Sequence, residues 1–152
     1  MAHQPSILEE LTVVIPVADG DEAWRTLLHD LRQLPVAAQI LLVGHSPEPD
    51  DLDVFLKQSG LCCTVEWLRS TRGRAQQMNH GASRAAHEFV WFLHADSRLT
   101  PQVLPALAGA LDRNANAVFY FDLEFLPDGP RWTSLNAKGA NLRSRIVRLP
   151  FG

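Results

Sequence analysis

Residues 11–17 read LTVVIPV, a run rich in β-branched side chains that is closed by Pro16 and Val17. The run is apolar at successive positions and not only at every second one, which indicates a strand buried on both faces. Strands of this kind occur in parallel sheets that helices cover on both sides. The stretch therefore predicts an α/β fold with a largely parallel sheet.

Strand and helix patterns alternate from this run to residue 111. Short apolar runs predict further strands over 39–43, 62–68 and 89–93. Asp19 and Glu22 have the spacing of a capping box before the first helix. Four helices are predicted between and after these strands. The first has the apolar stripe Trp24, Leu27, Leu28 and Leu31, and the second covers 52–58. The third covers 74–86 with Ala75, Met78, Ala82 and Ala85 on one face, and the fourth follows Thr100-Pro101 with the stripe Leu104, Leu107, Ala108 and Leu111. The alternation implies a three-layer α/β/α domain with a mostly parallel sheet and right-handed crossovers.

The pattern changes in the last third of the chain. Residues 118–125 alternate between apolar and polar, which predicts a half-exposed strand at an edge or in antiparallel pairing. A Pro-Asp-Gly-Pro turn at 127–130 precedes a last predicted helix with the stripe Leu135, Leu142, Ile146 and Leu149. No linker or repeat interrupts the sequence, so we expect residues 1–152 to form a single domain.

Composition narrows the class of protein. The chain has 152 residues, 46% of them hydrophobic and 20% charged, and a formal net charge of −3. These are ordinary globular values, and the negative charge argues against a nucleic-acid partner. The basic side chains of the last predicted helix, at 138, 143, 145 and 148, are interpreted as a solvated face. No apolar run approaches the ~20 residues of a membrane span.

Cys62 and Cys63 are adjacent, and neighbouring side chains on a strand point to opposite faces. Such a pair makes a poor disulfide and a poor metal site. We interpret both as small hydrophobic residues in a reducing compartment, which together with the lack of a visible signal peptide predicts a cytoplasmic protein.

Polar residues follow each of the predicted parallel strands, where ligands bind in open α/β sheets. They are Asp19, Asp21 and Glu22 after the first strand, Gly44, His45 and Ser46 after the second, Arg72 and Arg74 after the third, and His94-Ala95-Asp96 after the fourth. An imidazole and a carboxylate two residues apart are able to ligate a divalent metal that holds a diphosphate. The alternative is a loop pair joined by a hydrogen bond.

Two segments together resemble a known family. Residues 73–82 read GRAQQMNHGA and residues 89–99 read FVWFLHADSRL, and this combination resembles glycosyltransferase family 2. It is most similar to a bacterial subgroup of small cytoplasmic transferases associated with radical-SAM and selenium-domain proteins. Residues 121–123, 141–145 and 149–152 also fit that subgroup.

The resemblance implies a GT-A fold that binds a nucleotide-diphosphate sugar over the carboxyl edge of the sheet, usually with Mg²⁺ or Mn²⁺. The sugar would be transferred to an unknown acceptor with inversion. The resemblance assigns nucleotide-sugar binding to Pro16, Glu22, Arg74, Asn79 and Asp96, and metal binding to Asp96 and His94. For Arg74 and Asn79, a solvated helix start and a local backbone cap remain as alternatives.

The sequence departs from the family pattern at two places. Relatives carry an acid after the second strand that reads the nucleotide base, whereas residues 43–50 read VGHSPEPD. Either Asp50 or Asp51 supplies that acid, or the base pocket is altered. The subgroup also has an acid directly after the motif that ends in this chain at Gly152, so the general base is expected beyond this residue.

These departures leave two classes of function open. The first is a shortened transferase that lacks the acceptor and base segment and therefore transfers sugar weakly or not at all. The second is a non-catalytic, family 2-like module for binding or self-assembly, in which uncovered apolar surface favours a homodimer. A nucleotidyltransferase is less favoured, because no Gly-rich basic loop follows the first strand.

Overall fold

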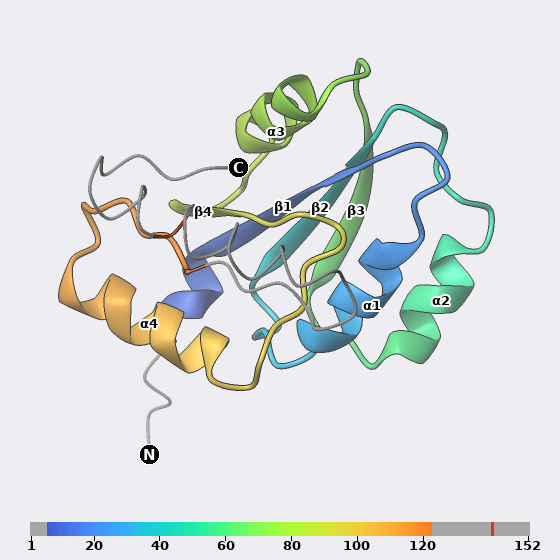
Figure 1. The fold of residues 1–152 in the computed structure, drawn as a ribbon. Coiled ribbons are helices and arrows are strands. Elements are labelled where there is room, and N and C mark those ends of the chain that lie inside the picture. The colour runs from blue at the N-terminus through green and yellow to red at the C-terminus, as the bar shows by residue number, and fades with distance from the viewer. Residues whose placement is uncertain (1–5, 123–140, 142–152) are drawn as a thin grey trace, which may run out of the picture. The chain divides into compact units, whose positions relative to one another are not determined.

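A computed structural model of the chain describes residues 6–122 and residue 141 (Figure 1). Its centre is a four-stranded sheet in the order β3-β2-β1-β4. The strands are β1 (Leu11–Val17), β2 (Gln39–Gly44), β3 (Thr64–Arg69) and β4 (Phe89–Phe92). β1 pairs in parallel with β2 and β4, and β2 pairs in parallel with β3. The predicted parallel sheet is therefore confirmed, with the run 11–17 between two neighbours.

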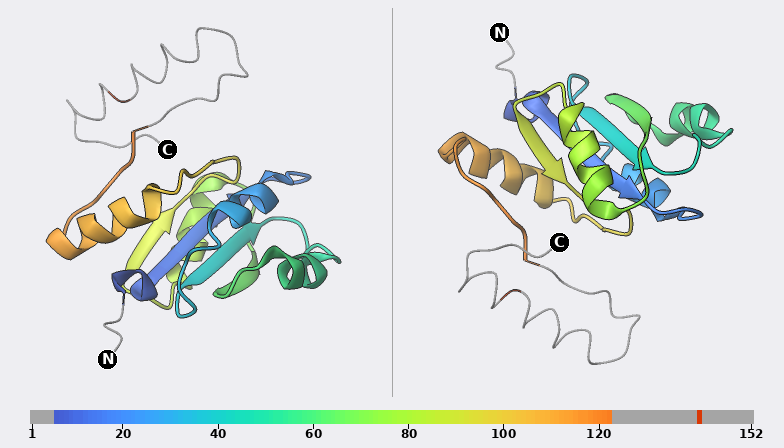
Figure 2. Two further views of the ribbon diagram at one scale, coloured as in Figure 1. Left: turned by 90° about the horizontal axis from the view of Figure 1, so that it is seen from below. Right: turned by 90° about the horizontal axis from the view of Figure 1, so that it is seen from above.

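Helices cover both faces of the sheet, which confirms the three-layer prediction. A 3₁₀ helix, η1 (Ile7–Glu10), leads into β1. The α-helices are α1 (Ala23–Asp30), α2 (Leu52–Ser59), α3 (Arg74–Ser83) and α4 (Val103–Arg113). Within this part of the chain, α3 lies on one face of the sheet, and α1, α2 and α4 lie on the other (Figures 1 and 2).

The sheet divides the core into two clusters. On the side of α1 and α4, Val13, Ile15, Ile40 and Leu42 pack with the helix stripes. The stripes are the predicted ones, since Trp24, Leu27, Leu28, Leu31, Leu104, Leu107 and Leu111 are all buried. On the side of α3 the buried cluster is smaller: Val14, Leu41 and Val43, with Leu68 and Val90 against it.

α3 differs from its prediction in length and in the face it buries. It ends at Ser83, and its buried residues are Gln77 and Gly81, while Ala75 is exposed. The expected stripe of Ala75, Met78, Ala82 and Ala85 followed hydrophobicity, whereas this helix meets the sheet through a glycine and a polar amide. Gly81 faces the sheet because only a residue without Cβ fits there: a Cβ would lie 2.4 Å from Val14 Cγ1.

Two predicted helix starts are wrong in detail. Asp19 and Glu22 form no capping box; instead the Asp21 carboxylate accepts a hydrogen bond from the Ala23 amide at 2.9 Å. The helix after Thr100-Pro101 begins at Val103, whose amide donates to the Thr100 carbonyl at 3.0 Å. A tight turn thus precedes α4 where a cap was expected.

The chain divides into two compact units, Met1–Ala115 and Asn116–Gly152, and the sheet lies entirely in the first. In the second unit, residues 118–122 form no strand, contrary to the prediction for 118–125. Alternation shows which side of a strand would be buried, but a strand also needs a backbone partner. Residues 123–125, the turn at 127–130 and the stripe of the last predicted helix lie outside the described residues.

The two cysteines are free and differ in environment. Cys63 is buried, and this burial raises the pKa of its thiol to about 11. Cys62 is exposed, so its interpretation as a buried hydrophobic residue is wrong. Among the described helices, none combines the length and the apolar character that a membrane span requires.

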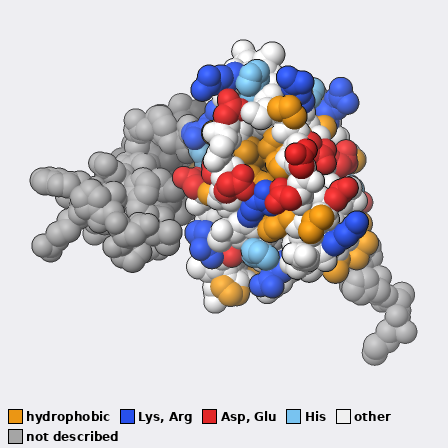
Figure 3. Space-filling view, turned by 90° about the vertical axis from the view of Figure 1, so that its right-hand side faces the viewer, with side chains coloured by type: hydrophobic (Ala, Val, Ile, Leu, Met, Phe, Trp, Pro, Cys, Tyr) orange, Lys and Arg blue, Asp and Glu red, His pale blue; other side chains and the backbone are white. Residues whose placement is uncertain are grey.

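Charge is mixed on the face shown in Figure 3. Acidic side chains run across the middle of this face, with Lys and Arg side chains above and below them. No single sign covers this face as a whole.

Candidate nucleotide-sugar site at the carboxyl edge of the sheet

A pocket of about 340 Å³ opens where the parallel strands end. Segments that follow β1, β2 and β4 line it, together with the loop after β3 and the start of α3. Its lining residues are Pro16, Val17, Ala18, Asp19 and Asp21 from the end of β1, His45 after β2, Arg72, Gly73, Arg74 and Gln77 from the start of α3, and His94, Ala95 and Asp96 after β4. The expectation that polar residues after these strands gather at one edge is therefore met for most of them.

The basic wall of the pocket is the start of α3. Gly73 precedes the helix with a φ of 132°, which favours glycine, and no side chain caps this helix end. Arg74 is the first helical residue, and Arg72 lies in the loop before it. A helix N-terminus attracts anions through its unpaired amides, and two guanidinium groups add to that attraction.

A second wall carries the predicted metal ligands. The Leu93 amide donates to the Val14 carbonyl at 3.0 Å, which extends the pairing of β4, and a turn follows in which the Ser97 amide donates to the His94 carbonyl at 3.0 Å. His94, Ala95 and Asp96 all line the pocket, and Ala95 is buried. Burial lowers the pKa of His94, the Arg74 charge lowers it further, and Asp96 opposes both. The neutral imidazole, which is the form that ligates metals, is thus favoured.

An ionised carboxylate lies between the ends of β1 and β2. The Ser46 hydroxyl donates a hydrogen bond of 2.6 Å to Asp19 Oδ1. This bond lowers the pKa of Asp19; burial opposes it, and the nearby charges of His45 and Arg72 add to the lowering, so the net pKa is below its ordinary value. Asp19 was noted in the sequence only as a polar residue after the first strand, and its partner Ser46 lies 27 residues away.

Gln77 is a pocket residue that sequence reasoning missed. Its side chain is buried, and its amide nitrogen donates to the Val17 carbonyl at 2.8 Å and to the Val43 carbonyl at 2.7 Å. The Gln77 side chain therefore joins α3 to the carboxyl ends of β1 and β2. A signal was present: Gly81, one turn later, marks the side of the helix that approaches the sheet most closely.

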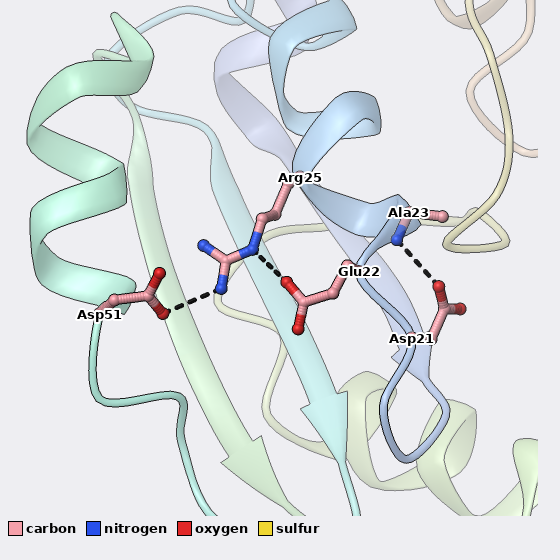
Figure 4. A network of polar contacts seen from close by, with 5 residues as sticks. All are labelled: Asp21, Glu22, Ala23, Arg25 and Asp51. Carbon is pink, nitrogen blue, oxygen red and sulfur yellow. Dashed lines mark hydrogen bonds and ion pairs between the residues drawn. The ribbon is translucent and has the colours of Figure 1, made fainter.

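Glu22 lies apart from the other predicted site residues. It pairs with Arg25, which also donates from Nη2 to Asp51 Oδ1 at 2.9 Å (Figure 4). Glu22 lines only a smaller hollow of about 70 Å³ beside the pocket. Arg25 also stacks its guanidinium on Trp24, 4.4 Å from the ring centroid, so this network joins the starts of α1 and α2.

The other predicted site residues do not all lie at the pocket. Pro16, Arg74, His94 and Asp96 line the pocket together, whereas Asn79 is exposed on α3 and lines neither hollow. Asp50 and Asp51, the possible substitutes for the missing acid after β2, also line neither of them. Within the described residues, no three His, Cys, Asp or Glu side chains converge as a metal site. His94 and Asp96, the predicted metal ligands, line the pocket together with Asp19, Asp21 and His45.

Comparison with known proteins agrees with this architecture. Solved structures of S. aureus TarS share the fold: one has a TM-score of 0.63 and 19% identity over 80% of this chain and 23% of that chain. TarS 1-349 in complex with UDP-GlcNAc gives a TM-score of 0.61 and 18% identity, covering 80% of this chain and 36% of that chain. The complex with UDP gives 0.60 and 17%, covering 80% and 37%. This chain thus spans well under half of the length of these structures.

The fold is an α/β fold of the GT-A type, with a parallel sheet and a ligand pocket at its carboxyl edge. The sequence model of glycosyl transferase family 2 matches residues 12–148, and the chain belongs to this family. No curated protein sequence matches the chain.

Proposed function

We propose that the pocket binds a nucleoside-diphosphate sugar and that the protein acts in glycosyl transfer. The observation that carries the proposal is the pairing of two walls: the start of α3 with Arg72 and Arg74, and the turn after β4 with His94 and Asp96. The first wall suits the negative charge of a diphosphate, and the second suits a cation bound to it. The volume of about 340 Å³ is in the range of small-molecule sites.

The residues fit a divalent metal that the substrate helps to hold. Mg²⁺ commonly binds through one or two carboxylates together with phosphate oxygens, and Mn²⁺ also accepts imidazole. Asp96 and His94 would supply the protein ligands. Such an ion neutralises negative charge on a diphosphate leaving group.

The pocket side chains would then act on the leaving group. As an acceptor hydroxyl oxygen bonds to the anomeric carbon and gives its proton to a base, the bond between that carbon and the diphosphate oxygen breaks, and its electron pair adds negative charge to the diphosphate oxygen. Arg74 and the unpaired amides of α3 stabilise this charge where it develops, which is the most effective form of electrostatic catalysis. Asp19 is ionised at the rim and repels phosphate, so the diphosphate is directed towards the α3 wall.

Two finer assignments belong to the proposal. The motifs at 73–82 and 92–96 favour the bacterial subgroup associated with radical-SAM and selenium-domain proteins. The described cysteines, Cys62 and Cys63, are both free, which supports a reducing compartment such as the cytoplasm.

Calorimetry with UDP tests the proposal, since UDP is the nucleotide present in a structural relative. In the presence of Mn²⁺, UDP should bind the wild-type chain, and Asp96→Asn should weaken binding about tenfold or more, as expected for loss of a charged ligand. Asp112→Asn, an exposed acid on α4 outside both hollows, is the matched control and should leave binding unchanged. Absence of UDP binding, or equal binding by wild type and Asp96→Asn, would contradict the proposal.

A further inference from the structure

Gln77 is unusual among the buried polar residues of the described chain. The three buried polar side chains are Thr12, Ser59 and Gln77. The Thr12 hydroxyl donates to the Gln39 side chain on the neighbouring strand, and the Ser59 hydroxyl donates to a carbonyl of its own helix. Gln77 alone lines the pocket, and its two hydrogen bonds reach across 60 and 34 residues of sequence.

The chemistry of this contact is specific to a primary amide. One nitrogen donates both of its hydrogens, one to the carbonyl of the last residue of β1 and one to the carbonyl of Val43 in β2. A glutamate of the same shape offers no such pair of donors, and a methionine offers none. An asparagine is one methylene shorter. Among these four residues, glutamine is therefore the one that has both the length and the two hydrogen-bond donors on one nitrogen that this contact uses.

The contact also determines where α3 begins. The helix buries two residues against the sheet, Gly81 near its end and Gln77 near its start. Gly81 is a close packing contact with Val14 and Val43, but it lies two turns from the first helical residue. Gln77 is therefore the one buried residue in the first two turns of α3, and its bonds hold these turns on the sheet.

Arg74 depends on that first turn. It precedes Gln77 by three residues, so both lie on neighbouring positions of one helix face, and both line the pocket. The Gln77 backbone amide closes the first helical turn by donating to the Gly73 carbonyl at 2.9 Å. The Gln77 side chain thus anchors on the sheet the same turn of α3 that carries Arg74.

We propose that Gln77 is a positioning residue for diphosphate binding: its amide holds the start of α3 on the ends of β1 and β2, and so places Arg74 and the helix N-terminus at the pocket. This inference rests on the proposed function, because it specifies how the same pocket meets the diphosphate. Gln77 itself acts through Arg74 and the α3 amides.

A double-mutant cycle with Arg74 separates positioning from a purely structural role. In the wild-type background, Gln77→Met should weaken UDP binding about tenfold, close to the loss in Arg74→Ala, because both remove one charge-assisted contact. In the Arg74→Ala background, the same change should weaken UDP binding by only about two- to threefold, because no guanidinium remains to be placed and only the α3 amides are affected. Gln58→Met, an exposed glutamine on α2, is the matched control and should bind UDP like wild type.

The outcomes distinguish this inference from the proposed function. Equal losses in both backgrounds would show that Gln77 acts independently of Arg74 and would overturn the inference while UDP binding stands. Failure of the wild-type chain to bind UDP would contradict the proposed function instead. Where Gln77→Met is too unstable for calorimetry, Gln77→Asn takes its place in the cycle and should show the same lack of additivity.

Hydrogen exchange tests the contact without any ligand. In Gln77→Met, the backbone amides of residues 77 and 78 should exchange at least about tenfold faster than in wild type, because the first turn opens locally. Amides of β1 should exchange as in wild type, which shows that the change is local. Unchanged exchange at residues 77 and 78 would overturn the inference even if UDP does not bind.

Discussion

At the scale of single residues, α3 is the element whose position depends most on side-chain identity. It lies against the sheet where Gly81 meets Val14 and Val43. A Cβ at residue 81 would lie 2.4 Å from Val14 Cγ1 and 3.1 Å from Val43 Cγ2. Both valines are fully buried and lie in the smaller core cluster, so they have little room to move away.

Gly81→Ala should therefore lower the free energy of unfolding by about 1–3 kcal/mol, the usual effect of overpacking. Gly109→Ala is the matched control, because a Cβ there would meet only Arg113 Nη1 at 3.5 Å. In the interior of α4 this second change should raise the free energy of unfolding by about 0.5–1 kcal/mol through helix propensity. Urea denaturation measures both. The same sign for the two variants would show that α3 is not close-packed on the sheet.

Residue patterns predicted burial well where the reason for burial is hydrophobic. The stripes of α1 and α4 and the run of β1 followed directly from their periodicity. Gln77 could not be predicted in this way, because a polar residue faces the sheet only when its partners lie there. Those partners are carbonyls at the ends of two strands, which no local pattern shows.

At the scale of elements, the loop that carries Asp96 is held by α1. Asp30 is the last residue of α1, and its carboxylate accepts hydrogen bonds from Arg98 Nε at 2.8 Å, Arg98 Nη2 at 3.2 Å and the Leu99 amide at 3.0 Å. The contact spans 68 residues of sequence. It fixes the segment that directly follows Asp96, so α1 helps to shape the pocket without lining it.

The pH dependence of stability should report this contact. Burial alone would raise the pKa of Asp30, but the hydrogen bonds from Arg98 and the Leu99 amide outweigh it, and the net pKa is lowered. A carboxyl whose pKa is lower in the folded than in the unfolded state stabilises the fold above its unfolded pKa, about 3.9. That contribution disappears as the pH falls through the folded pKa.

Asp30→Asn should thus lower the free energy of unfolding by about 1 kcal/mol at pH 7, a modest value because Arg98 is half exposed. The stability curves of wild type and variant should begin to converge as the pH falls below the pKa of Asp30 in the unfolded chain, and should meet below its pKa in the folded chain. Denaturation at a series of pH values measures this, with Glu48→Gln, an exposed loop acid, as the control. A difference that stays constant down to acid pH would show that the ionised carboxylate is not what stabilises the loop.

Elements and their order were the most predictable part of the fold. The four strands and four helices of the first unit lie close to their predicted ranges, since strand and helix periods differ clearly there. Helix starts were less predictable: caps depend on short-range competition between neighbouring side chains, and Asp21 took the place of Asp19. The strand predicted over 118–125 shows the limit of alternation as a signal, because residues 118–122 form none.

At the scale of the first unit as a whole, the pocket exists only when the sheet is assembled. Its lining residues come from four separate stretches, residues 16–21, 45, 72–77 and 94–96. The sequence predicted that these stretches meet, because parallel strands bring their carboxyl ends to one edge. It did not predict that Glu22 pairs with Arg25, nor that Arg25 also reaches Asp51, which comes from another element.

A ligand of this pocket should therefore bind the folded chain and not the unfolded one, and so stabilise the fold. At a UDP concentration about 100 times Kd, in the presence of Mn²⁺, the gain is about 2.7 kcal/mol. For a domain of this size, that corresponds to a rise in Tm of roughly 5–15 °C relative to Mn²⁺ alone. Uridine, which lacks the diphosphate, should give no measurable shift at the same concentration, because both walls of the pocket act on phosphate and its counter-ion. Scanning calorimetry measures Tm for each ligand. An equal rise in Tm with uridine would show that the binding energy comes from contacts with the nucleoside and not with the diphosphate. It would contradict the proposed roles of Arg74, His94 and Asp96.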